Sequence, residues 1–249
     1  MTKTTRQTAF VSSITTPQQQ PERLKSIETE TSKSIEPETL KSIETETSNS
    51  IVLDYPADIY FAVDGSGSIS DDDFRHALQT IAGLVLDNVR SLSDESTRVG
   101  LLQLAANVYI EVPLYKHSNV EQFAIDVLKT RQMGGVLYLS KAIERISRRG
   151  FGERFGGRSN VPHVIVLFTD GHVGYERNDV HRSIATAARL GVQVVSVGLS
   201  ERPNRDILRR ITGDFDNVIY ASDWQYHENG AVPQLSIALN RVLRRHRNQ

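Results

Sequence analysis

The sequence predicts a single doubly wound α/β domain, with a mostly parallel six-stranded sheet and helices on both faces. Three observations support this class. Short apolar segments alternate with amphipathic ones over about 195 residues. The segment HVIVLFT at 163–169 is apolar at nearly every position, as expected for a central strand covered on both sides. Turn and cap residues separate the segments, so each one is short enough to be one strand or one helix.

The strands are expected from runs of apolar and β-branched residues. In chain order they are Asp58–Val63, Arg98–Ala105, Val108–Val112, His163–Thr169, Val192–Val197 and Asn217–Tyr220. The second and third are joined by a tight connection at Ala106-Asn107, which predicts an antiparallel hairpin. The other strands are separated by helices, and this spacing predicts parallel crossovers.

The helices are expected from apolar residues at helical spacing and from their end signals. In chain order they are 74–89, Val120–Leu128, Ser140–Ser147, Val180–Leu190, Pro203–Ile211 and Val232–Arg245. Ser70, with Asp73 three residues later, is a capping signal for the first of them. Gly191 ends the fourth, and Pro203 stands where a first-turn proline is tolerated.

Residues 1–50 differ in composition from residues 51–249, which we assign to the α/β domain. The tetrapeptide Lys-Ser-Ile-Glu recurs at 25–28, 33–36 and 41–44, and LKSIETETS occurs at 24–32 and 40–48. One isoleucine in each octad buries too little apolar surface to offset the entropy of ordering the chain. We therefore expect residues 1–50 to be a disordered, low-complexity tail.

The bulk composition excludes several classes of function. A formal net charge of −1 in 249 residues gives no reason to expect binding to nucleic acid or to an anionic membrane. The absence of cysteine excludes disulfides, zinc–thiolate sites and cysteine nucleophiles. No apolar run is long enough to span a membrane, and the first twenty residues lack the apolar core of a secretory signal.

Two strand ends carry the same chemistry. The first strand ends in Asp64, within the motif DGSGSIS, and the fourth ends before Asp170-Gly171. If these strands are neighbours, both carboxylates reach one edge of the sheet and repel each other unless a cation lies between them. Residues two apart in an extended segment point the same way, so Ser66 and Ser68 add hydroxyl oxygens beside Asp64. Two carboxylates and two hydroxyls form an oxygen-rich set of the kind that Mg²⁺ accepts.

These motifs resemble the von Willebrand factor A domain family, of the kind found in matrilins and collagens. The resemblance rests on ADIYFAVDGSGSIS, RVGLLQLA, VIVLFTDG and GVQVVSVGL, and it covers roughly Ala57 to Arg245. It implies a Rossmann-like sheet with one antiparallel edge strand, and a metal-ion-dependent adhesion site that binds Mg²⁺ or Mn²⁺. It also implies that Asp64, Ser66, Ser68 and Asp170 are the metal residues and that a partner's acidic side chain completes the coordination.

One position departs from the family pattern. The family has a threonine ligand in a loop that here reads MGGVLYLSKA, and the matching Lys141 and Ala142 place Leu137 at the threonine. Leucine offers no oxygen, so we expect the loss to weaken the ligand-engaged state more than metal occupancy. Ser140 is a possible substitute, but we expect it to cap the following helix.

Other interpretations of these residues remain open. Asp64 and Asp170 can be turn residues that bond nearby backbone amides, with the serines as caps. Gly65 and Gly67 also imitate a dinucleotide-binding loop, but the third glycine is missing and Asp71–Asp73 would repel a pyrophosphate. A serine nucleophile elbow needs Gly-x-Ser-x-Gly, which the loop lacks.

The predicted function is a non-catalytic protein-binding or adhesion module. Its partner would be a protein with an exposed Glu or Asp, such as collagen or another matrix protein, and the resemblance favours an extracellular location although no signal peptide is visible. A metal-independent intracellular scaffold on the same fold is the alternative, and a nucleotide-binding enzyme is the least favoured. The arginines at 148, 149, 154 and 158 are expected to be solvated surface.

Overall fold

The computed structural model describes residue 53 and residues 55–173, 177–220 and 231–247. Residues 1–50, for which a disordered tail is predicted, lie outside the described residues. Among the described residues, none of the helices combines the length and the apolar character needed to cross a membrane.

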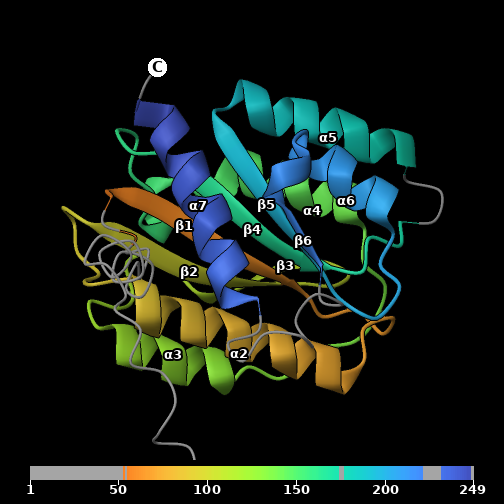
Figure 1. Cartoon of the computed structure of the whole chain (residues 1–249), viewed down its shortest axis with the longest axis horizontal. Helices are drawn as coiled ribbons and strands as arrows, with labels where there is room; N and C mark the ends of the chain where they lie inside the picture. The colour runs from red at the N-terminus through yellow and green to blue at the C-terminus, as the bar shows by residue number, and fades with distance from the viewer. Residues whose placement is uncertain (1–52, 54, 174–176, 221–230, 248–249) are drawn as a thin grey trace, which may run out of the picture. The chain divides into compact units, whose positions relative to one another are not determined.

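A six-stranded sheet forms the centre of the domain (Figure 1). Its strands are β1 Ala57–Asp64, β2 Thr97–Leu104, β3 Val108–Val112, β4 His163–Thr169, β5 Val192–Gly198 and β6 Val218–Tyr220. The spatial order is β3-β2-β1-β4-β5-β6, and only the β2–β3 pair is antiparallel. The predicted mostly parallel sheet with one antiparallel edge strand is therefore confirmed.

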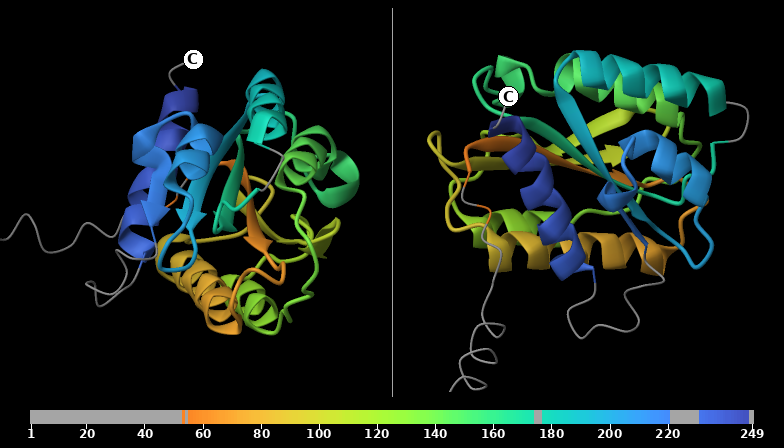
Figure 2. Two further views of the ribbon diagram at one scale, coloured as in Figure 1. Left: turned by 90° about the vertical axis from the view of Figure 1, so that its right-hand side faces the viewer. Right: turned by 45° about the horizontal axis from the view of Figure 1, so that its top comes forward.

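Helices cover both faces of the sheet, as Figure 2 shows from two further directions. They are α2 Asp71–Asn88, α3 Val120–Leu128, α4 Leu139–Arg145, α5 Arg177–Arg189, α6 Arg205–Thr212 and α7 Val232–Arg247, with a π-helical turn η1 Ile146–Gly150 and 3₁₀ turns η2 Glu153–Phe155 and η4 Phe215–Asn217. Residues of α2, α3 and α7 pack into one apolar cluster on the sheet. Residues of α4, α5 and α6 pack into a second cluster on the opposite face.

The two core clusters explain why β1 and β4 are apolar on both faces. Phe61 and Phe168 are fully buried in the first cluster, and Tyr60 and Leu167 are fully buried in the second. All eight residues of β1 are buried. Strands buried on both sides must lie in the middle of a parallel sheet, which brings the two strand ends that carry aspartates together.

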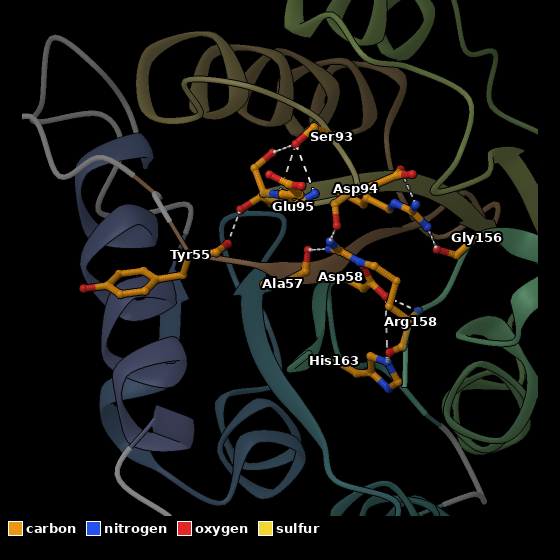
Figure 3. Close-up of polar contacts among 12 residues, drawn as sticks. Tyr55, Ala57, Asp58, Ser93, Asp94, Glu95, Gly156, Arg158 and His163 are labelled. Carbon is orange, nitrogen blue, oxygen red and sulfur yellow. Dashed lines mark hydrogen bonds and ion pairs between the residues drawn. The ribbon is translucent and has the colours of Figure 1, made fainter. Parts of the chain in front are cut away.

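A polar network anchors the opposite end of β1 (Figure 3). The Asp58 side chain is fully buried, and its Oδ1 accepts hydrogen bonds from Arg158 Nη2 at 2.7 Å and Nε at 2.9 Å. The backbone N–H of Arg158 donates to Asp58 Oδ2 at 2.6 Å. The guanidinium also donates to the carbonyl oxygens of Ala57 and Asp94. Arg158 is therefore part of the interior, and its assignment to solvated surface is wrong, because a buried carboxylate requires a cationic partner.

Candidate metal centre

The two predicted aspartates lie at the same edge of the sheet. Asp64 is the last residue of β1, and Asp170 directly follows β4. The two strands are hydrogen-bonded neighbours, with Val63 paired to Phe168. Both residues are nearly inaccessible to solvent, with exposed fractions of 1% for Asp64 and 5% for Asp170. Ligands bind at this edge of open parallel sheets, at the point where the strand order reverses. Here that point lies between β1 and β4.

The side chain of Asp64 organises the loop that follows β1. Its Oδ1 accepts a hydrogen bond from the backbone N–H of Ser66 at 3.0 Å, and its Oδ2 accepts one from the Thr169 hydroxyl at 2.8 Å. The Ser66 and Ser68 hydroxyl groups are hydrogen-bonded to each other, with their oxygens 3.1 Å apart and either one able to donate. Asp64 and the two serines therefore form one compact group of oxygens next to the end of β4.

The electrostatics of this group are unfavourable to a second negative charge. Burial raises the pKa of Asp64 above its ordinary value, and the nearby charge of Asp170 raises it further. The hydrogen bonds from Ser66 and Thr169 act in the opposite direction but do not cancel the effect of burial. A cation in contact with these oxygens would remove the cost of keeping Asp64 ionised.

Asp170 has a different set of partners. Its Oδ1 accepts a hydrogen bond from the backbone N–H of His172 at 2.9 Å, and its Oδ2 lies 3.3 Å from Nδ1 of the same histidine. The side chain of His172 is 58% exposed, so it stands at the rim of the site. The hydrogen bonds expected of turn residues are thus present at both aspartates, but each carboxylate oxygen has a second lone pair that these bonds leave available.

Two glutamines that the sequence did not single out hold the site loops in place. The Gln132 amide donates to the carbonyl oxygens of Ser66 and Ile69, at 2.9 and 3.0 Å. Gln103 Oε1 accepts the backbone N–H of Met133 at 2.7 Å. Thr169 also belongs to this supporting set, and only its position inside the Thr-Asp-Gly motif could have indicated it. No periodicity or spacing marks the glutamines.

Close packing at Gly65 explains why the loop contains glycine. A Cβ added there would lie 2.2 Å from Gln103 Oε1. Backbone hydrogen bonds then join this loop to the 133–135 segment, from Gly134 N–H to the Gly65 carbonyl at 2.8 Å and from Gly67 N–H to the Gly135 carbonyl at 2.9 Å. The two loops are therefore one hydrogen-bonded unit.

Leu137, which occupies the family's threonine position, supplies no oxygen ligand. Its half-buried side chain packs against the apolar cluster beneath α4. The helix begins at Leu139 with Tyr138 as N-cap, so the expectation that Ser140 caps this helix is wrong. Leu139 is buried in the core, and this contact places the N-cap at Tyr138, two residues earlier than a Ser140 cap would.

The available oxygens fit a small hard cation. Adjacent ligands of an octahedral Mg²⁺, with bonds of about 2.0–2.1 Å, lie about 3 Å apart. The 3.1 Å separation of the two serine hydroxyl oxygens matches such an edge. Within the described ranges, no group of three or more His, Cys, Asp or Glu side chains can hold a metal. The donors here are two carboxylates and two hydroxyls, which suits a cation that keeps water or a partner's oxygen in its remaining positions.

Comparisons of the sequence with known proteins identify its family and its relatives. The family model for the von Willebrand factor type A domain matches residues 58–230. Mouse matrilin-2 is 27% identical over 173 residues, which cover 68% of this chain and 18% of matrilin-2. The mouse collagen alpha-4(VI) chain is 31% identical over 176 residues, covering 68% of this chain and 7% of the collagen. The chain therefore corresponds to a small part of each relative.

Solved structures share the fold. One is proximal thread matrix protein 1 from the mussel byssus, solved with zinc in its MIDAS motif, the metal-ion-dependent adhesion site. Its TM-score is 0.63 and its sequence identity is 18%, and the match covers 77% of this chain and 48% of that protein's chain. Manganese-loaded TRAP protein of Plasmodium vivax gives a TM-score of 0.60 at 21% identity over 73% of this chain and 74% of its own. With the family model covering most of the described domain, this chain belongs to the von Willebrand factor type A domain family.

Proposed function

We propose that this chain is a non-catalytic protein-binding module that holds a divalent cation and receives an acidic side chain from its partner. Asp64, Ser66, Ser68 and Asp170 would hold Mg²⁺ or Mn²⁺. The bound cation would supply a positive centre for the partner's carboxylate. The observation that carries the proposal is the pairing of two buried aspartates at adjacent strand ends, next to two hydroxyl oxygens at the spacing of an octahedral edge.

The surface beside the site supports a protein partner. Three apolar residues stand within six positions of the loop that is hydrogen-bonded to the Asp64–Ser68 segment, namely Met133, Val136 and Tyr138. Their exposed fractions are 49%, 64% and 45%. Exposed apolar side chains grouped in a few residues are typical of protein interaction surfaces. A partner would therefore present an acidic residue together with apolar neighbours.

The relatives indicate the setting in which such a module acts. Matrilins and collagens are matrix proteins, and the similarity supports adhesion to a matrix partner outside the cell. The oxygen donors at the site include no nucleophile–base pair of the kind that acyl transfer requires. We therefore assign the module a binding role and no catalytic one.

Thermal unfolding with and without cation tests the proposal. Ligand at 100 times its Kd stabilises the native state by about 2.7 kcal/mol. For a domain of this size that is a rise in Tm of roughly 5–10 °C. Mg²⁺ or Mn²⁺ should produce this rise in the parent chain after chelator treatment, and Asp64→Ala should abolish it. Asp72→Asn is the matched control, because Asp72 is an exposed acid of the first turn of α2 that pairs with Arg75 and does not join the site.

A metal-independent scaffold is the second candidate, and the packing of Leu137 against the core favours it. The two candidates give opposite results in one further measurement. If binding of a matrix protein to the parent chain is lost in chelator and restored by Mg²⁺, the cation-dependent module is supported. Binding that is equal in chelator and Mg²⁺, with no thermal shift in the parent, would show that the scaffold is correct.

A further inference from the structure

A pocket of about 360 Å³ opens at the β3 side of the sheet, and neither the cation site nor the family comparison assigns it a role. Its walls come from β2, β3, the end of α4, the π-helical turn η1 and the turn η2. The volume is at the lower end of the range for small-molecule sites. It therefore has room for a ligand of about ten non-hydrogen atoms.

The lining of this pocket is apolar at the base and cationic at the rim. Leu102, Ile110, Ile146 and Phe155 contribute apolar surface, and the first of these is almost completely buried. Arg145, Arg149 and Arg154 also line it, and none of the lining residues is acidic. Three guanidinium groups around an apolar base create a local positive field that attracts an anion.

The arginines are available to a ligand. Within the described part of the chain, the Arg145 and Arg149 side chains form no hydrogen bond or ion pair, and both residues are exposed. The guanidinium carbon of Arg154 lies 4.5 Å from the centroid of the Phe155 ring. This contact keeps the guanidinium next to the pocket wall. The neighbouring Arg148 does not line the pocket. Its Nε lies 2.9 Å from Glu144 Oε1, with which it forms an ion pair.

The backbone geometry supports a built site. The helix widens into the π-helical turn Ile146–Gly150 where it borders the pocket, and such turns occur frequently at functional sites. At Gly150 an added Cβ would lie 3.1 Å from Ile146 Cγ2, so a side chain there would crowd the wall. The π-helical turn contributes Ile146, Arg149 and Gly150 to the pocket lining.

We propose that this pocket binds a small amphipathic anion, with an apolar body on the base and a carboxylate or phosphate group on the arginine rim. An inorganic anion would leave the apolar base in contact with water, and a neutral apolar ligand would leave the guanidinium groups without a counter-charge. Arginine matches both carboxylate and phosphate in bidentate geometry, so the two head groups share one recognition chemistry. The site is separate from the cation site, and the proposal does not depend on it.

Titration of the full chain in chelator, followed by amide chemical shifts, tests the proposal. The probes are 4-phenylbutyrate, phenyl phosphate, the neutral 4-phenylbutanol and inorganic phosphate. A ligand of this size should bind with a Kd on the order of 0.1–1 mM. The two amphipathic anions should shift the amides of residues 145–155, and the alcohol and inorganic phosphate should bind at least tenfold more weakly. Equal binding of the alcohol, or of inorganic phosphate, would overturn the proposal.

Substitutions of lining residues test whether the amphipathic anions bind in this pocket. The double change Arg145→Gln and Arg149→Gln should weaken the amphipathic anions about tenfold or more, because it removes two charge-assisted hydrogen bonds. Val108→Phe should also weaken them by filling the base, since Val108 lines the pocket from β3. Arg148→Gln is the matched control and should leave the affinity unchanged. Absence of binding to the parent at millimolar probe, or equal loss in the control, would refute the assignment.

Discussion

The buried ion pair between Asp58 and Arg158 gives the most direct test of how the domain is held together. The Asp58 carboxylate has no solvent contact, and the Arg158 side chain is 12% exposed. The guanidinium supplies two hydrogen bonds to that carboxylate and two more to backbone carbonyl oxygens. Arg158→Met keeps much of the side-chain volume and removes all four.

The expected cost follows from what the change leaves behind. Among the described residues, the Asp58 carboxylate would retain the backbone N–H of residue 158 and, 3.8 Å from its Oδ2, the Nε2 atom of His163. Removing one partner of a buried ion pair costs about 3–5 kcal/mol, because the other charge remains in the interior uncompensated. At about 2–4 °C per kcal/mol for a domain of this size, Tm should fall by roughly 6–20 °C.

Chemical denaturation of the parent and three variants checks this reasoning. Adding Asp58→Asn to Arg158→Met should recover part of the lost free energy of unfolding, because no charge is then buried alone. Arg148→Met is the matched control, since that arginine forms an exposed pair with Glu144, and it should cost less than about 1 kcal/mol. If Arg158→Met costs no more than this control, or if the double variant is the least stable of the set, the buried charge is not the cause.

Three further predictions concern single positions. Leu137→Thr should tighten Mg²⁺ binding in calorimetry by adding an oxygen ligand, at a cost of about 1–3 kcal/mol because a half-buried leucine is lost; unchanged affinity would contradict the ligand assignment. Tyr60→Phe should change stability to urea by less than about 1 kcal/mol, because the buried Tyr60 hydroxyl lies near the Leu114 backbone but makes no hydrogen bond of ordinary geometry among the described residues; a loss above about 1 kcal/mol would show that the contact with Leu114 is a full hydrogen bond. The Arg245 guanidinium lowers the pKa of Asp214, so this acid stabilises the fold above its ordinary pKa and the benefit is lost as the pH falls through the lowered one. Asp214→Asn should therefore be less stable than the parent at pH 7, and the difference should shrink progressively as the pH falls below the ordinary pKa of an aspartate. A difference that stays constant as the solution is acidified would count against the ion pair.

The sheet and the position of the candidate site could be predicted from the sequence because both depend on local patterns. Continuous apolar segments place β1 and β4 in the middle, and the rule that ligands bind at carboxyl strand ends then brings Asp64 and Asp170 together. The hairpin was visible from the tight connection between its two strands.

The residues that support the site could not be predicted in the same way. Gln132 and Gln103 act through hydrogen bonds to backbone groups 30 or more residues away, and a single glutamine carries no periodic signal. Arg158 was placed on the surface for a related reason, since its partner lies 100 residues earlier in the chain. The π-helical turn Ile146–Gly150 could not be predicted either, because no residue type in ISRRG distinguishes it from an α-helical end or a loop.

The glycine hydrogen bonds between the Asp64–Ser68 segment and the 133–135 segment have a thermodynamic consequence. Neither segment can be displaced without stretching the same two bonds, so a ligand that repositions one also changes the free energy of the other. Thermodynamic linkage then requires equal effects in both directions. A partner that binds at Val136 and Tyr138 would change the affinity for the ion by the same factor by which the ion changes the affinity for that partner.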